Sequence, residues 1–145
     1  MNEFTIVTVI ARPVDEVFAV LTDLERMPLW VPGMTEASVT SDGPLEAGSA
    51  LLYRGTFLGR GLEMPFVCTG LTENKHFGTR TTGGPFYLET DAVLEPAAGG
   101  TRVTTAYRGE SRGFFKLAEP LVERAVRREL EGNFATLKDI LEARD

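Results

Sequence analysis

The last part of the chain, from Phe114 to Asp145, has the pattern of one long helix, and no other segment limits the possible folds as much. Its apolar residues recur at the spacing that gathers side chains on one face of an α-helix. They are Leu117, Leu121, Ala125, Leu130, Phe134, Leu137 and Leu141. Most of the sequence before this segment is strand-like. A long helix laid across an antiparallel sheet tends to enclose space, so we expect a ligand cavity between the helix and the sheet.

Three charged residues interrupt the apolar pattern of the helix. Arg124, Arg128 and Glu129 lie near the edges of the apolar face, where a dry core would hold aliphatic side chains. In one interpretation they pair with one another or with carboxylates of the sheet. In the other, they recognise a carboxylate or phenolate of a ligand, a task for which the arginine fork is well suited.

The rest of the sequence predicts an α+β fold. A β-branched segment, Glu3–Ala11, predicts the first strand, and Pro13 then suits the first turn of a helix. Asp23 can cap a second short helix from Leu24 to Met27. Glycines and prolines divide the following sequence into further strands, which we expect to pair as a meander. These are Glu36–Thr40, Ala50–Phe57, Leu62–Thr72, Phe77–Thr82, Phe86–Leu94 and Arg102–Glu110.

Alternation of apolar and polar residues assigns one face of each strand to the interior. The hydroxyl-bearing residues on these inward rows are Tyr53, Thr90, Thr105 and Tyr107. The strand Leu62–Thr72 is ambiguous, because Val67 and Leu71 oppose the row that we assign inward. That row contains Leu62, Met64, Phe66 and Cys68. Glu63 would face the interior, as a general acid or base, only if the phase of this strand were reversed.

Length and composition are those of one globular domain spanning residues 1–145. Hydrophobic residues make up 43% and charged residues 25% of the sequence. There is no apolar run of about 18 residues and no charged-then-apolar leader, so we expect a cytoplasmic protein without an integral membrane segment. A net charge of −6 repels phosphate backbones, which argues against nucleic acid as a partner. We expect a monomer or homodimer.

The sequence contains little that points to a catalytic centre. One histidine and one cysteine, His76 and Cys68, are too few for a clustered metal site, and we expect no metal. Strand direction carries Cys68 away from the turn that holds His76, so a Cys–His nucleophile is disfavoured. No glycine-rich loop stands between a strand and a helix, and we expect no bound cofactor.

The remaining candidates are side chains that would line a cavity. Aromatic residues on the inward rows can be plain core, but together they would form walls for a flat or greasy ligand. The inward hydroxyls either bond to the protein or trapped water, or they orient that ligand. Our ligand-binding candidates are Trp30, Tyr53, Phe57, Phe66, Phe86, Leu88, Thr90, Thr105, Tyr107, Leu121, Arg124, Ala125, Arg128 and Glu129.

Several short motifs occur in an order and spacing that resembles a known superfamily. They are Ile10-Ala11-Arg12-Pro13-Val14 with Val17-Phe18, the segment Leu21–Trp30, Leu45-Glu46-Ala47-Gly48, Gly100-Thr101-Arg102-Val103-Thr104, and Leu137–Glu142. The chain resembles the START-like (SRPBCC) proteins, often described as polyketide cyclase/dehydrase. The resemblance implies a helix-grip fold, in which a seven-stranded antiparallel sheet wraps around a long C-terminal helix, with two short helices after the first strand.

The same resemblance implies a class of ligand rather than a reaction. Members of this superfamily bind hydrophobic ligands such as lipids, sterols and quinones, and some cyclise polyketides. We therefore expect a protein that binds a hydrophobic or aromatic small molecule between sheet and helix. One alternative is a cyclase or aromatase that assists enolisation with Tyr or Glu. Another is a protein- or membrane-interaction module with a vestigial pocket.

Overall fold

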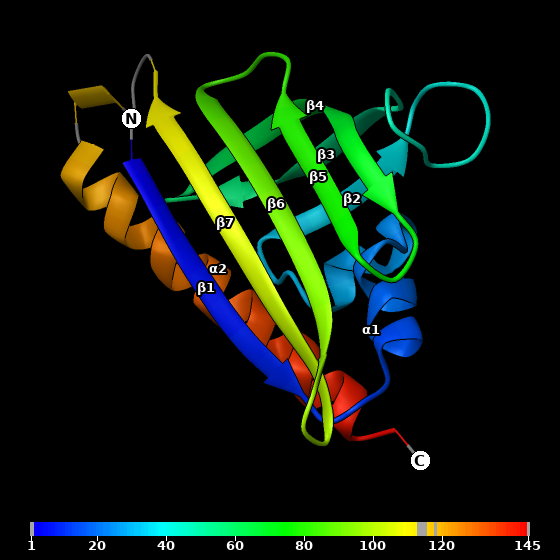
Figure 1. Ribbon diagram of the computed structural model, residues 1–145. Helices are drawn as coiled ribbons and strands as arrows, with labels where there is room; N and C mark the ends of the chain where they lie inside the picture. The colour runs from blue at the N-terminus through cyan, green and yellow to red at the C-terminus, as the bar shows by residue number, and fades with distance from the viewer. Residues whose placement is uncertain (1, 113–115, 118, 145) are drawn as a thin grey trace.

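The computed structural model describes residues 2–112, 116–117 and 119–144, and it consists of one antiparallel sheet and a long helix laid along one face of it (Figure 1). Two short helical segments lie beside the sheet near one end of that helix. In chain order the elements are β1 (Asn2–Ile10), α1 (Val14–Leu21), η1 (Leu24–Leu29, a 3₁₀ helix), β2 (Met34–Val39), β3 (Ala50–Phe57), β4 (Arg60–Thr72), β5 (His76–Thr81), β6 (Phe86–Ala97), β7 (Gly100–Ser111) and α2 (Glu119–Glu142).

The sheet has seven strands in the order β1-β7-β6-β5-β4-β3-β2. Strands β2 to β7 form the expected meander, and β1 pairs antiparallel with β7. The pairing register shifts between Cys68 and Gly70 and again between Met34 and Glu36. Such irregularities bend strands and increase their twist, which helps a sheet to curve. The α+β helix-grip prediction is confirmed.

The predicted element bounds agree with the structure to within a few residues. The strand Ala50–Phe57 is found as predicted. The second short helix extends to Leu29, beyond the predicted end at Met27, and includes Pro28. Within the described residues the long helix begins at Glu119. The predicted start at Phe114 lies outside the described residues.

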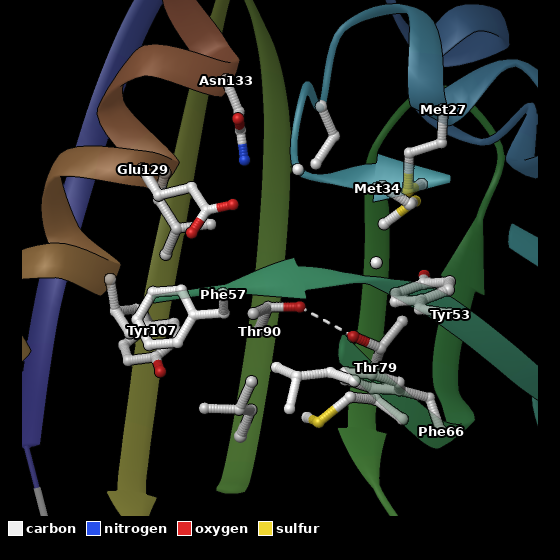
Figure 2. A pocket seen from close by; sticks show the side chains of 18 of the residues that line it. Met27, Met34, Tyr53, Phe57, Phe66, Thr79, Thr90, Tyr107, Glu129 and Asn133 are labelled. Carbon is white, nitrogen blue, oxygen red and sulfur yellow. Dashed lines mark hydrogen bonds between the residues drawn. The ribbon is translucent and has the colours of Figure 1, made fainter. Parts of the chain in front are cut away.

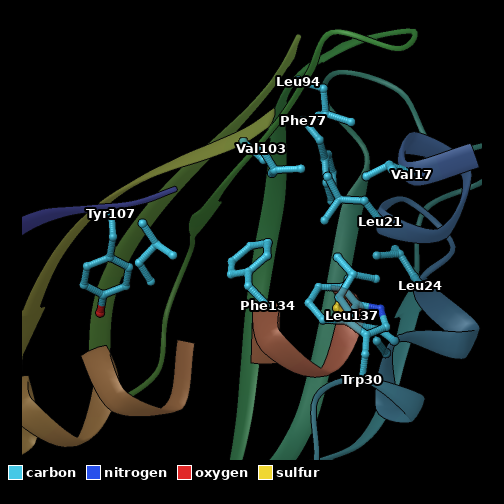
Figure 3. Packing of buried hydrophobic residues seen from close by; sticks show 14 of the residues in the cluster. Val17, Leu21, Leu24, Trp30, Phe77, Leu94, Val103, Tyr107, Phe134 and Leu137 are labelled. Atoms are coloured by element: carbon cyan, nitrogen blue, oxygen red, sulfur yellow. The ribbon is translucent and has the colours of Figure 1, made fainter. Parts of the chain in front are cut away.

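The core fills the space between α2, the sheet and the short helices (Figure 3). Leu137 and Leu141 of α2 are fully buried. Phe77 and Val103 contribute from the sheet, and Val17 contributes from α1. Burying these apolar side chains is the main favourable term that holds helix and sheet together.

The predicted apolar face is wrong for the first turns of α2. Leu117, which precedes α2, is 93% exposed, and Leu121 of α2 is 60% exposed. A five-residue step, such as that from Ala125 to Leu130, advances an α-helix by roughly 1.4 turns. Leu121 and Ala125 therefore lie away from the face that contains Leu130, and Val122 is the buried residue of this turn.

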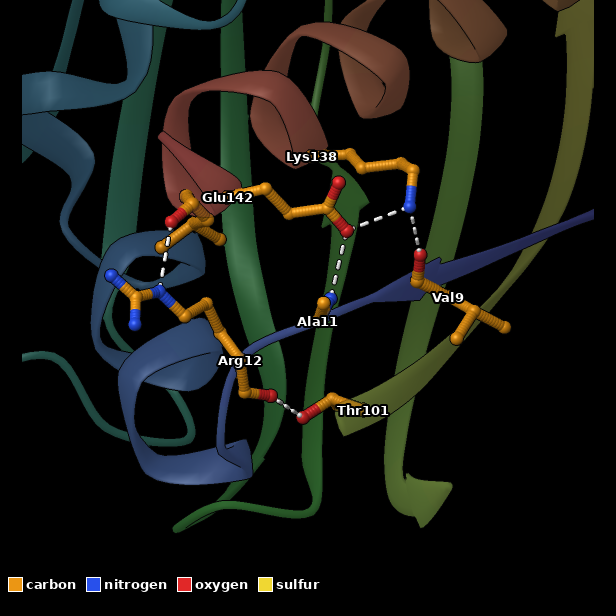
Figure 4. A network of polar contacts seen from close by, with 7 residues as sticks. Val9, Ala11, Arg12, Thr101, Lys138 and Glu142 are labelled. Atoms are coloured by element: carbon orange, nitrogen blue, oxygen red, sulfur yellow. Dashed lines mark hydrogen bonds and ion pairs between the residues drawn. The ribbon is translucent and has the colours of Figure 1, made fainter. Parts of the chain in front are cut away.

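Polar contacts attach the end of α2 to the loop between β1 and α1 (Figure 4). The Glu142 carboxylate accepts the Ala11 N–H at 2.8 Å and the Lys138 ammonium at 2.7 Å. These two donors hold the pKa of Glu142 below its usual range. Lys138 also donates to the Val9 carbonyl at 2.7 Å, and Arg12 donates to the Leu141 carbonyl at 3.0 Å. The C-terminal end of the helix is thus fixed to the sheet edge.

We predict that Gly132→Ala stabilises the protein. Gly132 lies inside α2, and nothing stands within 4 Å of the position that a Cβ would take. Alanine should raise the free energy of unfolding by about 0.5–1 kcal/mol, because it loses less backbone entropy on folding. Chemical denaturation followed by circular dichroism measures the change. Gly55→Ala is the control and should destabilise, because its Cβ would collide with the Gly33 carbonyl oxygen.

Candidate functional site

A cavity of about 270 Å³ lies between α2 and the inner face of the sheet. Its walls are mainly apolar, with Phe57 and Phe66 from the sheet and Met27 and Met34 on the side of η1 and β2 (Figure 2). The methionines are flexible and polarisable side chains that adapt to ligands of different shape. Side chains therefore fill only part of the space between the sheet and α2.

Most of the predicted candidates line this cavity. Those that do are Trp30, Tyr53, Phe57, Phe66, Phe86, Leu88, Thr90, Thr105, Tyr107 and Glu129. The inward rows of β3, β4, β6 and β7 bring the sheet residues together, since alternate side chains of a strand share a face. Their role in binding a ligand stays a prediction.

Four candidates on α2 do not line the cavity: Leu121, Arg124, Ala125 and Arg128. Leu121, Arg124 and Arg128 are exposed and Ala125 is half-buried. The reason is the angular shift of the helix face described above. The cavity-facing positions of α2 are instead Val126, Glu129, Leu130, Asn133 and Phe134.

Sequence reasoning also missed cavity residues outside the inward rows. Val126 and Asn133 could have been found by stepping back in helical periods from Leu137 and Leu141. Gly33 and Met34 follow η1 and line the cavity at its edge. Nothing in the local sequence marks them, because only tertiary packing brings this segment against α2.

Aromatic pairs build much of the wall. The rings of Tyr53 and Phe66 have centroids 4.6 Å apart, and Phe57 meets Phe86 edge-on at 5.5 Å. Trp30 lies 5.8 Å from Phe134 of α2. Each pair joins residues from different elements, so these contacts hold the wall together and offer flat surfaces to a ligand.

The hydroxyl groups around the cavity are neutral. Thr79 and Thr90 bond to each other, with 2.8 Å between their oxygens. Burial raises the pKa of Tyr53, and burial together with nearby Glu123 raises the pKa of Tyr107. Both phenols therefore keep their protons at physiological pH. The Thr105 hydroxyl is buried without a hydrogen-bond partner among the described residues.

Glu129 brings a negative charge to this apolar site. Its side chain extends from α2 into the cavity (Figure 2). Desolvation raises its pKa, and no cation or hydrogen bond from the described residues opposes that shift. Arg54, which also lines the cavity, directs its guanidinium to Glu36 and Glu63, each at 3.1 Å. Glu129 is therefore the acidic group that a ligand in the cavity would meet.

The alternative acid or base, Glu63, lies on the opposite face of the sheet. Met64, Phe66 and Cys68 are buried while Glu63 is exposed, so the strand has the phase that we assigned. Glu63 pairs with Arg54 on the outer surface. A catalytic role for Glu63 inside the cavity is thereby excluded.

The single cysteine and the single histidine do not pair with each other in the structure. Cys68 is buried, and burial raises the pKa of its thiol, which keeps it protonated. His76 contacts Asp91 at 2.7 Å. Across residues 2–112, 116–117 and 119–144, no group of three or more His, Cys, Asp or Glu side chains gathers as a metal site would require.

Comparison with known proteins shows the family to which this chain belongs. Residues 1–142 match the family described as polyketide cyclase / dehydrase and lipid transport. The chain belongs to this family. A comparison with curated proteins found no match. No helix in the described part of this family member is long and apolar enough to cross a membrane.

Solved structures share the fold of this family member at low sequence identity. TTHA0849 from Thermus thermophilus superposes with a TM-score of 0.84 at 18% identity, covering 98% of both chains. The Zhui aromatase/cyclase from Streptomyces sp. R1128 gives 0.79 at 13% identity, covering 97% of this chain and 93% of the other. A START superfamily protein from Mycobacterium smegmatis gives 0.73 at 16%, covering 94% and 99%. At these identities the likeness shows the fold alone.

We predict that Glu129→Gln stabilises the ligand-free protein at neutral pH. Because the native state raises the pKa of Glu129, it binds a proton more readily than the unfolded chain. The contribution of Glu129 to stability is therefore most favourable below the ordinary glutamate pKa and is lost as the pH rises through the raised value. Thermal unfolding between pH 4 and 8 should show the variant melting above wild type at pH 7.5, with the difference vanishing toward pH 4. An equal gap at both ends would contradict this assignment.

Proposed function

We propose that this protein binds a small hydrophobic or aromatic molecule in the cavity between the sheet and α2, without catalysing a reaction. The observation that carries the proposal is an apolar cavity of about 270 Å³ walled by aromatic and methionine side chains. Membership of a family whose description includes lipid transport supports it. So does the scarcity of acid and base groups around the cavity.

The volume favours a small ligand. Pockets that hold drug-sized molecules have volumes of roughly 300–1,000 Å³, and 270 Å³ lies just below that range. One or two fused rings suit such a space better than a sterol or a long polyketide chain. The aromatic walls favour a flat shape, because ring faces and edges are complementary to other rings.

Blocking the cavity should abolish binding of a neutral fluorophore. We expect Val126→Trp to weaken uptake of prodan, a neutral naphthalene-based dye, by about tenfold or more, since the larger side chain fills the space that the dye needs. Dye emission, excited beyond tryptophan absorption, measures the dissociation constant. Circular dichroism checks that the variant is folded.

Ala135→Trp is the matched control for this experiment. Ala135 is exposed on the same helix and does not line the cavity, so the added ring should leave prodan binding unchanged. If wild type fails to bind the dye, or both variants bind as wild type does, the binding proposal is wrong.

A hydroxyl in the wall should contribute only modestly to binding. Tyr53→Phe removes one phenol from the cavity and should change the prodan dissociation constant by about tenfold or less, because one hydrogen bond contributes roughly 0.5–1.5 kcal/mol net. The same titration measures it. A much larger loss would mean that polar contacts, rather than apolar contact, supply most of the affinity.

One observation favours a cyclase-type enzyme as the second candidate. A carboxylate with a raised pKa in an apolar cavity is a suitable general base for removing a proton next to a carbonyl group. The catalytic group would be Glu129, and the neutral phenol of Tyr53 would be the available hydrogen-bond donor to the substrate oxygen. We prefer simple binding, because the small volume does not suit a folded poly-β-keto chain.

A rate measurement separates the two candidates. With a short poly-β-ketone as test substrate and ring formation followed by absorbance, wild type should be inactive if the protein only binds. If it is a cyclase, Glu129→Gln should lower the rate on the order of a hundredfold or more with little change in affinity. That outcome would contradict the binding proposal and show that the protein is a cyclase.

The interaction-module alternative has less support. It requires a vestigial pocket, and the space between α2 and the sheet is a cavity of about 270 Å³ lined by aromatic side chains. The cytoplasmic location, the absence of nucleic acid as a partner and the monomeric or dimeric state stay predictions.

A further inference from the structure

Two polar side chains with unused hydrogen-bonding capacity lie on the α2 side of the cavity, and the buried Trp30 Nε1 and Thr105 hydroxyl elsewhere in its wall also lack partners among the described residues. Glu129 and Asn133 project from α2 toward the interior, four residues and about one helical turn apart (Figure 2). In the part of the chain that the structure describes, no ion pair or hydrogen bond reaches the side chain of either residue. On the opposite side, the Thr79 and Thr90 hydroxyls already satisfy each other.

The Glu129 carboxylate lies close to the backbone of Gly33, which also lines the cavity. A side chain at position 33 would place its Cβ 2.6 Å from Oε1 of Glu129 and 3.1 Å from the Thr56 carbonyl oxygen. A Cβ at this position would require the carboxylate to move from the place that it occupies. The group thus lies between α2 and the segment after η1, where it loses water without gaining a partner.

Asn133 supplies a second, independent polar group. The residue is only 6% exposed, and its amide is aimed into the cavity. Buried amides in folded proteins almost always have hydrogen-bond partners. The Asn133 amide, which faces the cavity without a partner among the described residues, is therefore a group that a polar atom of a ligand would satisfy.

Among the described residues, no cation faces these two side chains. The Arg54 guanidinium is engaged with Glu36 and Glu63 on the outer face of the sheet. Arg124 and Arg128 are exposed and outside the cavity, and Arg127 stacks over the Phe4 ring at 4.8 Å. A carboxylate or phosphate brought into this space would meet the like charge of a half-buried Glu129.

We propose that the cavity selects flat apolar molecules that carry a hydrogen-bond donor, a ring hydroxyl or amine, which donates to the Glu129 carboxylate beside Asn133, and that it rejects anionic molecules of the same shape. This inference rests on the proposed binding function and specifies the ligand class. Hydrogen bonds to an ionised acceptor are stronger than hydrogen bonds between neutral groups. An anionic ligand would instead be repelled by the Glu129 carboxylate, and this repulsion makes the cavity selective. Desolvation of Glu129 in the free protein also means that a donor relieves an existing penalty.

Three naphthalenes of similar shape test the proposal by displacement of prodan at pH 7.5. Naphthalene has no polar group, 2-naphthol carries a donor, and 2-naphthoate carries a negative charge. We expect 2-naphthol to bind about tenfold more tightly than naphthalene, and 2-naphthoate to bind more weakly than either. This rank order is measured on the wild-type protein and needs no variant to fold.

Variants then assign the selectivity to residues. In Glu129→Gln, the ratio of the 2-naphthol and 2-naphthoate affinities should fall by about tenfold or more, because the charge that favours the donor and repels the anion is gone. Glu131→Gln removes the same charge from an exposed position on the same helix and should leave the ratio unchanged. Asn133→Leu should reduce the advantage of 2-naphthol over naphthalene.

The outcomes separate this inference from the binding function. If prodan binding is absent, or is insensitive to Val126→Trp, the binding function itself fails. If prodan binds in the cavity but 2-naphthoate equals or exceeds 2-naphthol, the donor proposal is overturned while the binding function stands. An unchanged ratio in Glu129→Gln, or an equal change in Glu131→Gln, would also overturn it.

Discussion

The anchoring of the C-terminal half of α2 against the sheet determines where space remains in this fold. Leu137 and Leu141 are fully buried, and Lys138 and Glu142 bind backbone groups at the end of β1. Arg12 donates to carbonyl groups at the helix end, which have no partner within the helix. With one end fixed in this way, the preceding turns of the helix extend across the sheet. Side chains fill only part of the space between these turns and the sheet.

The division between filled and open space follows from side-chain size. Near α1, Leu94 and Val103 pack with Val17 into continuous core. Toward the middle of the helix, the inward positions of the sheet include Thr79, Thr90, Ala92 and Thr105, which are small. Protein interiors are normally close-packed, so small residues beneath a helix that is held in place leave a cavity rather than a collapsed contact. Aromatic residues around them keep its walls apart.

The Glu129 carboxylate gives this mainly apolar cavity one negatively charged side. Glu129 loses hydration without gaining a cation, which raises its pKa and opposes folding at neutral pH. Groups perturbed in this manner cluster at functional sites. Two further features support the inference that Glu129 and its surroundings are a specific part of the binding surface. Gly33 lies beside the carboxylate without a side chain of its own, and the Asn133 amide is its neighbour on α2.

The sequence alone was enough to derive the order of elements, the meander and the inward rows of the strands, because a period of two ties each strand residue to one face. It could therefore place Tyr53, Phe66 and Thr90 on the cavity side. It failed for the first turns of α2, where apolar residues occur on both faces: the predicted Ala125 does not line the cavity, whereas Val126, which is in helical period with Leu137 and Leu141, does. Tertiary structure also decided which of the three suspected charges faces the interior: Glu129 does, and both arginines do not. The meeting of Glu129 with Gly33 joins segments far apart in the chain, and no local pattern encodes such a contact.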